Sequence, residues 1–174
     1  DIPPISVDGI AYHYWVENDA KYKFHPYYGF GGVDATAAVN AAVSYTAGSL
    51  GTQTYKDWTL SGCFNCTVSE GVTATSVINI SSSGTLEFVR VRVNMSHSLP
   101  YEIGMRLVSP SGTETTILQP YTALNVNPNG YIYLAASAFY GESMNGNWTL
   151  KLFDHNTNSS QMTLGDWSIA FYHR

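Results

Sequence analysis

The strongest constraint on the fold is an alternation of apolar and polar side chains that runs through the chain from about Thr54 onward. Between residues 89 and 95, valines and a methionine alternate with arginines and an asparagine. A period of two predicts a strand with one buried and one solvated face. Similar stretches predict strands over residues 72–80, 103–107, 113–118, 131–135, 148–153 and 167–172. About eight such strands predict an all-β fold, an antiparallel β-sandwich of the jelly-roll type.

A different pattern precedes these strands. Residues 1–33 are crowded with aromatic side chains without periodicity and predict loops and short extended pieces. Asp34 is a suitable N-cap for a helix that should end near Tyr45. The small apolar side chains on one face of this helix are Ala35, Val39, Ala42 and Val43. Because no second helix is predicted to cover that face, we expect it to pack on a larger body, and we interpret the start at Asp1 as an internal cut point.

The composition narrows the class of protein. The net charge is −5 and only 12% of the residues are charged, without a basic stripe, which disfavours nucleic-acid binding. The abundance of Tyr, Thr, Ser, Asn and Gly is typical of an extracellular β protein. No apolar run in the sequence is long enough to span a membrane. These features favour a secreted protein.

The two cysteines, Cys63 and Cys66, are separated by two residues in a predicted loop between strands. A redox pair of this spacing usually opens a helix, and a zinc site would need a second pair of ligands. We therefore favour a local disulfide over free thiols, and both over a metal or redox role.

Four motifs follow one another in the β region. They are the runs Leu86 to Val91 (LEFVRV), Leu107 to Thr113 (LVSPSGT), Phe139 to Asp154 (containing FYGE, GNWTL and FD) and Gly165 to Ile169 (GDWSI). In this order and spacing, the set resembles the P domain, or homo B domain, that follows the catalytic domain in kexin-like and many bacterial subtilisin-type proteases. The residues that this resemblance marks as structural are Glu87, Ser109, Pro110, Gly112, Gly141, Glu142, Trp148, Asp154 and Trp167.

The segment from Phe24 to Ala35 (FHPYYGFGGVDA) resembles the end of the subtilisin-type catalytic domain in the same family, where a Tyr-Gly-Phe-Gly turn leads into the final helix. Two departures are Lys21, where the family commonly has Gly, and the run Ser98 to Ile103, where many relatives have Arg-Gly-Asp-Leu. The resemblance implies that residues 1–48 are a remnant of the catalytic domain and residues 49–174 the P domain.

The resemblance also implies a role. In a secreted subtilisin/kexin-like serine endopeptidase, such a domain packs on the catalytic domain, supports its folding and maturation, and tunes its response to calcium and pH. The expected partner is therefore the catalytic domain of the same protease, with a protein substrate as a second partner and with neither nucleic acid nor membrane.

The chain alone is not expected to be an enzyme. A subtilisin-type triad needs an Asp in Asp-Ser/Thr-Gly, a His in His-Gly-Thr and a Ser in Gly-Thr-Ser before a helix, and the sequence contains none of these. The histidines that lack the flanking pattern of a catalytic base are His13, His25, His97, His155 and His173. Any peptidase chemistry would belong to the parent protein.

Several polar residues can be interpreted either as structural or as functional. Glu142 and Asp154 flank a Gly-rich hairpin, where they hold loop amides or, with Asn156 and backbone carbonyls, bind calcium. No cofactor is firmly predicted, because no Asp-x-Asp-x-Asp-Gly loop is present. His97 is expected to bond to turn backbone, and Glu87 to pair with Arg92 or Arg106. Trp148 and Trp167 are expected to anchor the core.

Two other functions stay open. The sandwich could be a binding module for a protein substrate or carbohydrate, which would require a coplanar row of exposed aromatic side chains. The candidates for that row are Trp58, Tyr121, Tyr131, Tyr133 and Tyr140. Alternatively, the domain could be a spacer or a maturation handle that is removed after secretion.

Overall fold

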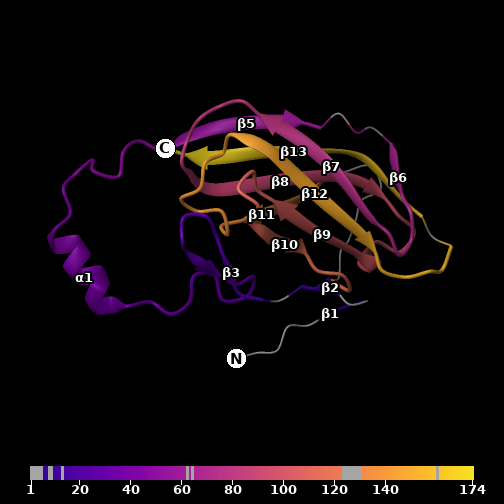
Figure 1. Cartoon of the computed structure of the whole chain (residues 1–174), viewed down its shortest axis with the longest axis horizontal. Helices are drawn as coiled ribbons and strands as arrows, with labels where there is room; N and C mark the ends of the chain where they lie inside the picture. The colour runs from indigo at the N-terminus through magenta and orange to yellow at the C-terminus, as the bar shows by residue number, and fades with distance from the viewer. Residues whose placement is uncertain are drawn as a thin grey trace.

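The computed structural model describes residues 6–7, 10–12, 14–61, 63, 65–122, 131–159 and 161–174. Two antiparallel sheets face each other as a sandwich, and an N-terminal segment with one α-helix lies beside them (Figure 1). The predicted fold class, an all-β sandwich, is confirmed.

One sheet has four strands, and its outer edge is a hairpin. In spatial order the strands are β10 (Glu114–Leu118), β9 (Ile103–Val108), β12 (Gly146–Asp154) and β7 (Thr73–Ile80). The predicted turn between β9 and β10 closes where the Ser109 amide donates to the Thr113 carbonyl at 2.9 Å. The 3-10 helix η1 (Pro100–Glu102) leads into β9.

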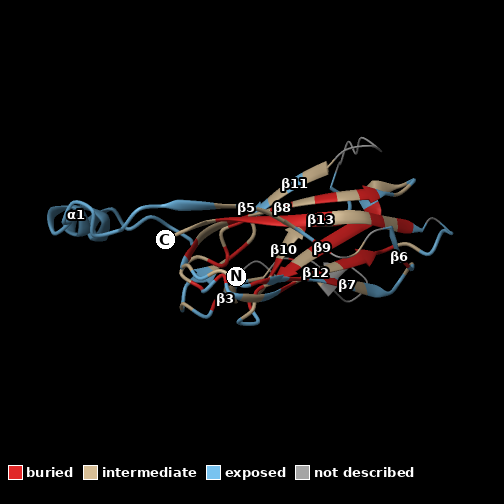
Figure 2. Ribbon diagram, turned by 90° about the horizontal axis from the view of Figure 1, so that it is seen from above, coloured by how far each residue is buried: buried red, intermediate tan, exposed pale blue. Residues whose placement is uncertain are grey.

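The opposite sheet is built around the two longest strands. Its order is β11 (Tyr131–Ala136), β8 (Leu86–Ser96), β13 (Met162–His173) and β5 (Thr54–Leu60), and β6 (Cys66–Val68) also pairs with β13. Strand β8 follows the predicted alternation, because Val89, Val91, Val93 and Met95 are all buried. In Figure 2 the buried residues concentrate where the two sheets face each other.

The core is anchored by one tryptophan from each sheet, as the sequence predicts. Trp148 on β12 and Trp167 on β13 are both fully buried. The Trp148 Nε1–H donates to the Met144 carbonyl at 3.0 Å, and the Trp167 Nε1–H donates to Ser76 Oγ at 2.9 Å. Each indole therefore contributes apolar area without leaving its N–H unpaired.

The N-terminal segment contains two short sheets. They pair β1 (Ser6–Val7) with β2 (Ile10–Ala11), and β3 (Val16–Glu17) with β4 (Lys23–Phe24). The helix α1 (Ala35–Val43) follows, capped by Asp34, whose Oδ1 accepts from the Ala37 amide at 2.8 Å.

Helix α1 has no partner among the residues that the structure describes. All residues from 31 to 55 are exposed, and the helix projects away from the sandwich (Figures 1 and 2). Within the described ranges, no helix combines the length and apolar character needed to cross a membrane.

Candidate functional site

The most extensive functional surface is the junction between residues 10–30, here called the tail, and the sandwich. Tyr12 is fully buried in this junction. Its hydroxyl contacts His155 Nε2, and its ring lies beside the guanidinium of Arg106, 5.2 Å from the ring centroid. A Cβ on Gly104 would collide with the Tyr12 ring. The tail thus inserts an aromatic side chain into a site that only glycine leaves open.

Asn18 makes a second attachment. This buried side chain donates from Nδ2 to the carbonyls of Ala138 at 2.9 Å and Tyr140 at 2.8 Å. Its Oδ1 accepts from the Tyr22 amide at 2.9 Å, which holds the tail turn in shape. One amide side chain therefore satisfies three backbone groups, two of them on the sandwich.

Glu142 connects the tail, the β9–β10 hairpin and the loop before β12. Its buried carboxylate accepts from the Asp19 amide at 2.9 Å, from Ser111 Oγ at 2.8 Å and from Thr113 Oγ1. Neighbouring Gly141 has φ +82°, and a Cβ there would lie 2.8 Å from the Ala20 side chain. The tail therefore approaches this loop as closely as glycine allows.

Aromatic contacts extend the junction. The rings of Tyr22, Phe30 and Tyr140 meet edge to face, with centroids 5.2 to 6.2 Å apart. Such pairs add to the attraction from buried area alone. The partial exposure of Tyr22 and Phe30 leaves an aromatic surface on the outside of the tail.

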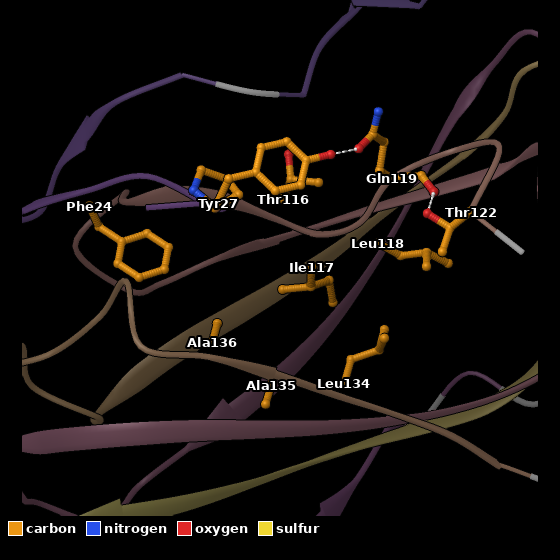
Figure 3. A pocket seen from close by; sticks show the side chains of 11 residues that line it. Phe24, Tyr27, Thr116, Ile117, Leu118, Gln119, Thr122, Leu134, Ala135 and Ala136 are labelled. Carbon is orange, nitrogen blue, oxygen red and sulfur yellow. Dashed lines mark hydrogen bonds between the residues drawn. The ribbon is translucent and has the colours of Figure 1, made fainter. Parts of the chain in front are cut away.

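A cavity of about 390 Å³ lies where the tail covers the edges of β10 and β11 (Figure 3). Phe24 and Tyr27 come from the tail, Ile117 from β10 and Leu134 from β11. The Tyr27 hydroxyl donates to Gln119 Oε1 across the opening. The described lining contains no carboxylate, histidine or cysteine, so the cavity offers apolar contact and no acid–base chemistry.

A buried acidic cluster lies at the opposite end of β12 from the Glu142 loop. His97, Glu102 and Asp154 bring one nitrogen or oxygen atom each within 4.8 Å of the others. His97 Nε2 lies 3.2 Å from Asp154 Oδ2. The pKa of Asp154 lies above its ordinary value. Burial is the main cause; the contact with His97 opposes the shift, and the nearby Glu70 carboxylate adds to it. Sequence reasoning singled out Asp154 but missed Glu102 as its neighbour.

The sequence-predicted calcium candidates do not form one group. Glu142 precedes β12 and Asp154 ends it, so the strand separates the two carboxylates. Asn156 lies with Asp154, where its Nδ2 donates to Glu102 Oε1 at 2.5 Å. Glu142 instead holds neighbouring segments together, because its carboxylate accepts three hydrogen bonds from the tail and the β9–β10 hairpin.

The remaining predictions on single side chains have mixed outcomes. His97 bonds to turn backbone as expected, because the Leu99 amide donates to its Nδ1 at 3.0 Å. The expected partner of Glu87 is wrong: its carboxylate forms an ion pair with Arg174 at the other end of the chain. The structure joins Cys63 and Cys66 in a disulfide with a Cα–Cα distance of 6.1 Å.

The aromatic candidates for substrate binding fall in three places: Trp58, Tyr131 and Tyr133 lie together, and Tyr121 and Tyr140 lie apart from them. Trp58 and Tyr133 meet on the outer face of the five-stranded sheet, where the guanidinium of Arg92 lies 4.8 Å from the Trp58 ring centroid. The planes of Trp58 and Tyr133 are inclined by 66°. Tyr121 pairs instead with Tyr101, and Tyr140 belongs to the tail junction. The described residues therefore contain no coplanar row of these five rings.

The fold and the attached tail define a class: an all-β sandwich domain with an N-terminal extension bound to it. Residues 86–171 match the family described as the proprotein convertase P-domain. This part of the chain belongs to the P-domain family of subtilisin/kexin-like serine proteases, and it is a P domain rather than a catalytic domain.

Two proteases of similar sequence agree with the assignment to the P-domain family. The chain is 27% identical over 165 residues to the extracellular serine protease of Aeromonas sobria, covering 86% of this chain and 26% of that protein. It is 30% identical over 181 residues to human proprotein convertase subtilisin/kexin type 6, covering 91% and 17%. The chain thus spans about a quarter or less of the length of these two relatives.

A solved structure shows the same fold. The crystal structure of the Aeromonas sobria serine protease superposes with a TM-score of 0.79 at 23% identity, covering 92% of this chain and 33% of that one. The complex of that protease with a chaperone superposes with a TM-score of 0.81 at 21% identity. These matches support the arrangement of the two sheets and the tail.

Proposed function

We propose that this chain is the non-catalytic P domain of a secreted subtilisin/kexin-like serine endopeptidase, joined to the C-terminal end of its catalytic domain. Residues 1–48 would be that end and residues 49–174 the P domain. The domain packs on the catalytic domain, supports its folding and maturation, and adjusts its response to calcium and pH. Peptide-bond hydrolysis belongs to the parent protease.

The observation that carries the proposal is the exposure of helix α1. Val39 is 61% exposed and Val43 83% exposed on a helix of nine residues. A helix this short is marginal in water unless an apolar face packs on a partner. The described part of the chain supplies no such partner, and the catalytic domain is the one that the family relationship offers.

The tail explains how such packing would stabilise both parts. Tyr12, Asn18 and the Asp19 amide attach the tail to the sandwich at three separate points. If the tail is the end of the catalytic domain, these contacts tie the two domains along the chain as well as through α1. Contacts that exist only in the folded pair raise the stability of both domains.

The experiment is a thermal melt of the parent protease carrying a charge on one face of α1. Val39→Asp places an acid on the apolar face, and Ala41→Asp places the same acid on the opposite face as a matched control. We expect Val39→Asp to lower the yield of mature protease and the Tm of its catalytic domain, with Ala41→Asp close to wild type. Equal behaviour of both variants and the wild type would contradict the docking role.

A second measurement tests stabilisation and calcium tuning together. The separately expressed catalytic domain is melted with and without this chain across a calcium titration. We expect a rise in its Tm that grows with calcium. No shift at any calcium level would mean that the domain does not stabilise its catalytic partner.

A carbohydrate-binding role is not proposed, because the inclined rings of Trp58 and Tyr133 lack the shared plane that stacking on a sugar chain requires. The proposed secreted location is supported by the composition and by the similarity to the extracellular serine protease of Aeromonas sobria.

A further inference from the structure

The outer face of the five-stranded sheet carries two arginines among aromatic side chains. Arg90 and Arg92 alternate with buried valines on β8 and therefore point outward together. Trp58 comes from β5, and Tyr131 and Tyr133 come from β11, so the rings approach β8 from both of its sides. This group is here called the arginine–aromatic face: Trp58, Arg90, Arg92, Tyr131 and Tyr133.

Small side chains beneath the group leave room for it. Ser168 and Ala170 on β13 alternate with core residues of the same strand and therefore point outward, yet both are fully buried. Strands β13 and β8 separate Trp58 from Tyr133, but the centroids of these two rings are 6.2 Å apart. The rings thus extend over the sheet toward each other, and the outward side chains between them are covered.

Aromatic rings hold both guanidinium groups in place. Arg92 Cζ lies 4.8 Å from the Trp58 ring centroid and 4.7 Å from the Tyr131 ring centroid. Arg90 Cζ lies 5.3 Å from the same Trp58 ring. Cation–π contacts engage the faces of a guanidinium and leave its N–H edge for in-plane hydrogen bonds. Since these side chains are already ordered, a ligand does not have to order them on binding.

Neither arginine of this face has an acidic partner among the described residues. The other arginines of the chain, Arg106 and Arg174, each form an ion pair with a glutamate. Arg92 Nε is buried, and within the described ranges no acceptor reaches it. The hydroxyl of Ser168, opposite Arg92 in the register of β13 with β8, is buried and unpartnered in the same way. Two unpaired positive charges on a chain of net charge −5 indicate an anionic partner.

The acidic side chains near the face are engaged by other groups. Asp166 accepts from the Tyr131 hydroxyl at 2.7 Å, and Asp57 accepts from the Trp58 amide at 2.8 Å. Both carboxylates add negative charge beside the arginines. This disfavours a nucleic acid or a sulfated polysaccharide, because binding a polyanion requires a row of cations. A single carboxylate, which matches the planar fork of a guanidinium, suits the site better.

We propose that the arginine–aromatic face is a docking surface for a segment of another protein that presents a Glu or Asp side chain beside an apolar one. The carboxylate accepts from the guanidinium N–H groups of Arg92 and Arg90. The apolar neighbour packs on Tyr133, which is 60% exposed. Tyr, Trp and Arg are the side chains that most often dominate the binding energy of protein interfaces.

This surface is separate from the tail junction. The tail attaches to β9 at Gly104 and to the loops that carry Ala138, Glu142 and His155. In Figure 2, β3 of the tail and β11 lie on opposite sides of the buried core. The proposal therefore goes beyond docking on the catalytic domain and does not depend on it.

The test uses the whole 174-residue chain and two fluorescein-labelled peptides. One peptide alternates Glu with Tyr, and the other alternates Gln with Tyr, so that they differ only in the carboxylates. Fluorescence anisotropy measures the affinity of each. We expect the acidic peptide to bind about tenfold or more tightly than the Gln peptide, and its affinity to fall as salt is raised.

Variants of the chain locate the binding. Arg92→Gln and Arg90→Gln should each weaken binding of the acidic peptide by about tenfold. Arg92→Lys keeps the positive charge but loses the planar fork, so it should weaken binding by about threefold or more. Lys23→Gln removes a positive charge from an exposed position on the tail and is the matched control, which should bind as wild type does.

Each other outcome overturns the proposal. Equal affinity for the two peptides, or no binding of the acidic one, would mean that the arginines only cover the sheet. Unchanged binding by both Gln variants would place the peptide elsewhere. Tighter binding of heparin or single-stranded DNA would identify a polyanion site, and dimerisation that Arg92→Gln abolishes would identify a second copy as the partner. Should Arg92→Gln fail to fold, Arg92→Lys decides, because it keeps the charge and the aliphatic stem.

Discussion

The carboxylate of Glu142 accepts a hydrogen bond from the backbone amide of Asp19 at 2.9 Å, across 123 residues of chain. The same carboxylate accepts from Ser111 and Thr113 in the β9–β10 hairpin. One buried side chain therefore determines how the tail, the hairpin and the loop before β12 sit together.

Replacing Glu142 by Gln should loosen all three segments. A neutral amide has only one acceptor oxygen and carries no charge, so it weakens the hydrogen bonds from these donors. We expect a loss of about 1–3 kcal/mol in the free energy of unfolding, measured by urea denaturation. Glu17→Gln, at an exposed position on β3, is the matched control and should stay within about 0.5 kcal/mol of wild type. Equal losses in the two variants would contradict the role given to Glu142.

Gly104→Ala should detach the beginning of the tail. The added methyl group would overlap the Tyr12 ring, and we expect destabilisation of about 1–3 kcal/mol together with faster proteolysis within the tail. Tyr12→Leu in the same chain removes the overlapping ring atoms, so the double variant should lose less than the sum of the single variants. Additive losses would show that the two residues do not compete for the same space.

Stability should fall at acid pH through Glu114. Burial raises the pKa of this carboxyl, but hydrogen bonds from Lys151 and Arg106 outweigh it and hold the pKa below its ordinary value. A lowered pKa in the folded state contributes stability that is present above the unfolded pKa of about 4.3 and is lost as pH falls through the folded pKa.

The measurement is the urea midpoint between pH 6 and pH 3. The difference between wild type and Glu114→Gln should be largest near pH 6 and shrink toward pH 3, and it should stay below about 1 kcal/mol because the ion pairs are partly solvated. Lys151→Met should move the loss to higher pH. A difference that grows on acidification would reverse the assigned sign.

The pairing of Cys63 with Cys66 can be tested by alkylation and mass measurement. The unfolded, unreduced chain should take up no alkyl group, and the reduced chain two. Because the closed loop is only four residues long, the double Cys→Ser variant should lose no more than about 2 kcal/mol. Two alkyl groups on the unreduced chain would show free thiols instead.

The sequence predicted the strands best where both sheets bury one face. Strand β8 shows the clearest alternation, and its valines form the middle of the core. Strand β5 (Thr54–Leu60) was not specified because none of its residues is fully buried, so it lacks the contrast on which the period of two depends. The helix was predicted by its cap at Asp34, which is a local signal.

The sequence does not predict which charged side chains, distant along the chain, lie next to each other in the fold. The sequence predicts that Glu87 pairs with Arg92 or Arg106, but its partner is Arg174, which the alignment of β8 with β13 brings alongside. Glu102 meets Asp154 for the same kind of reason, through the register of β9 with β12. A one-residue change of register would separate either pair, and the sequence alone does not show which register is adopted.

The attachments of the tail also bear on how the chain is synthesised. Tyr12, Asn18 and Asp19 leave the ribosome before Ala138, Glu142 and His155, which receive them and are made more than a hundred residues later. During translation the tail must therefore wait without its partners while the strands of the sandwich emerge. The junction between the tail and the sandwich can therefore close only late in folding, after the last strands have been made.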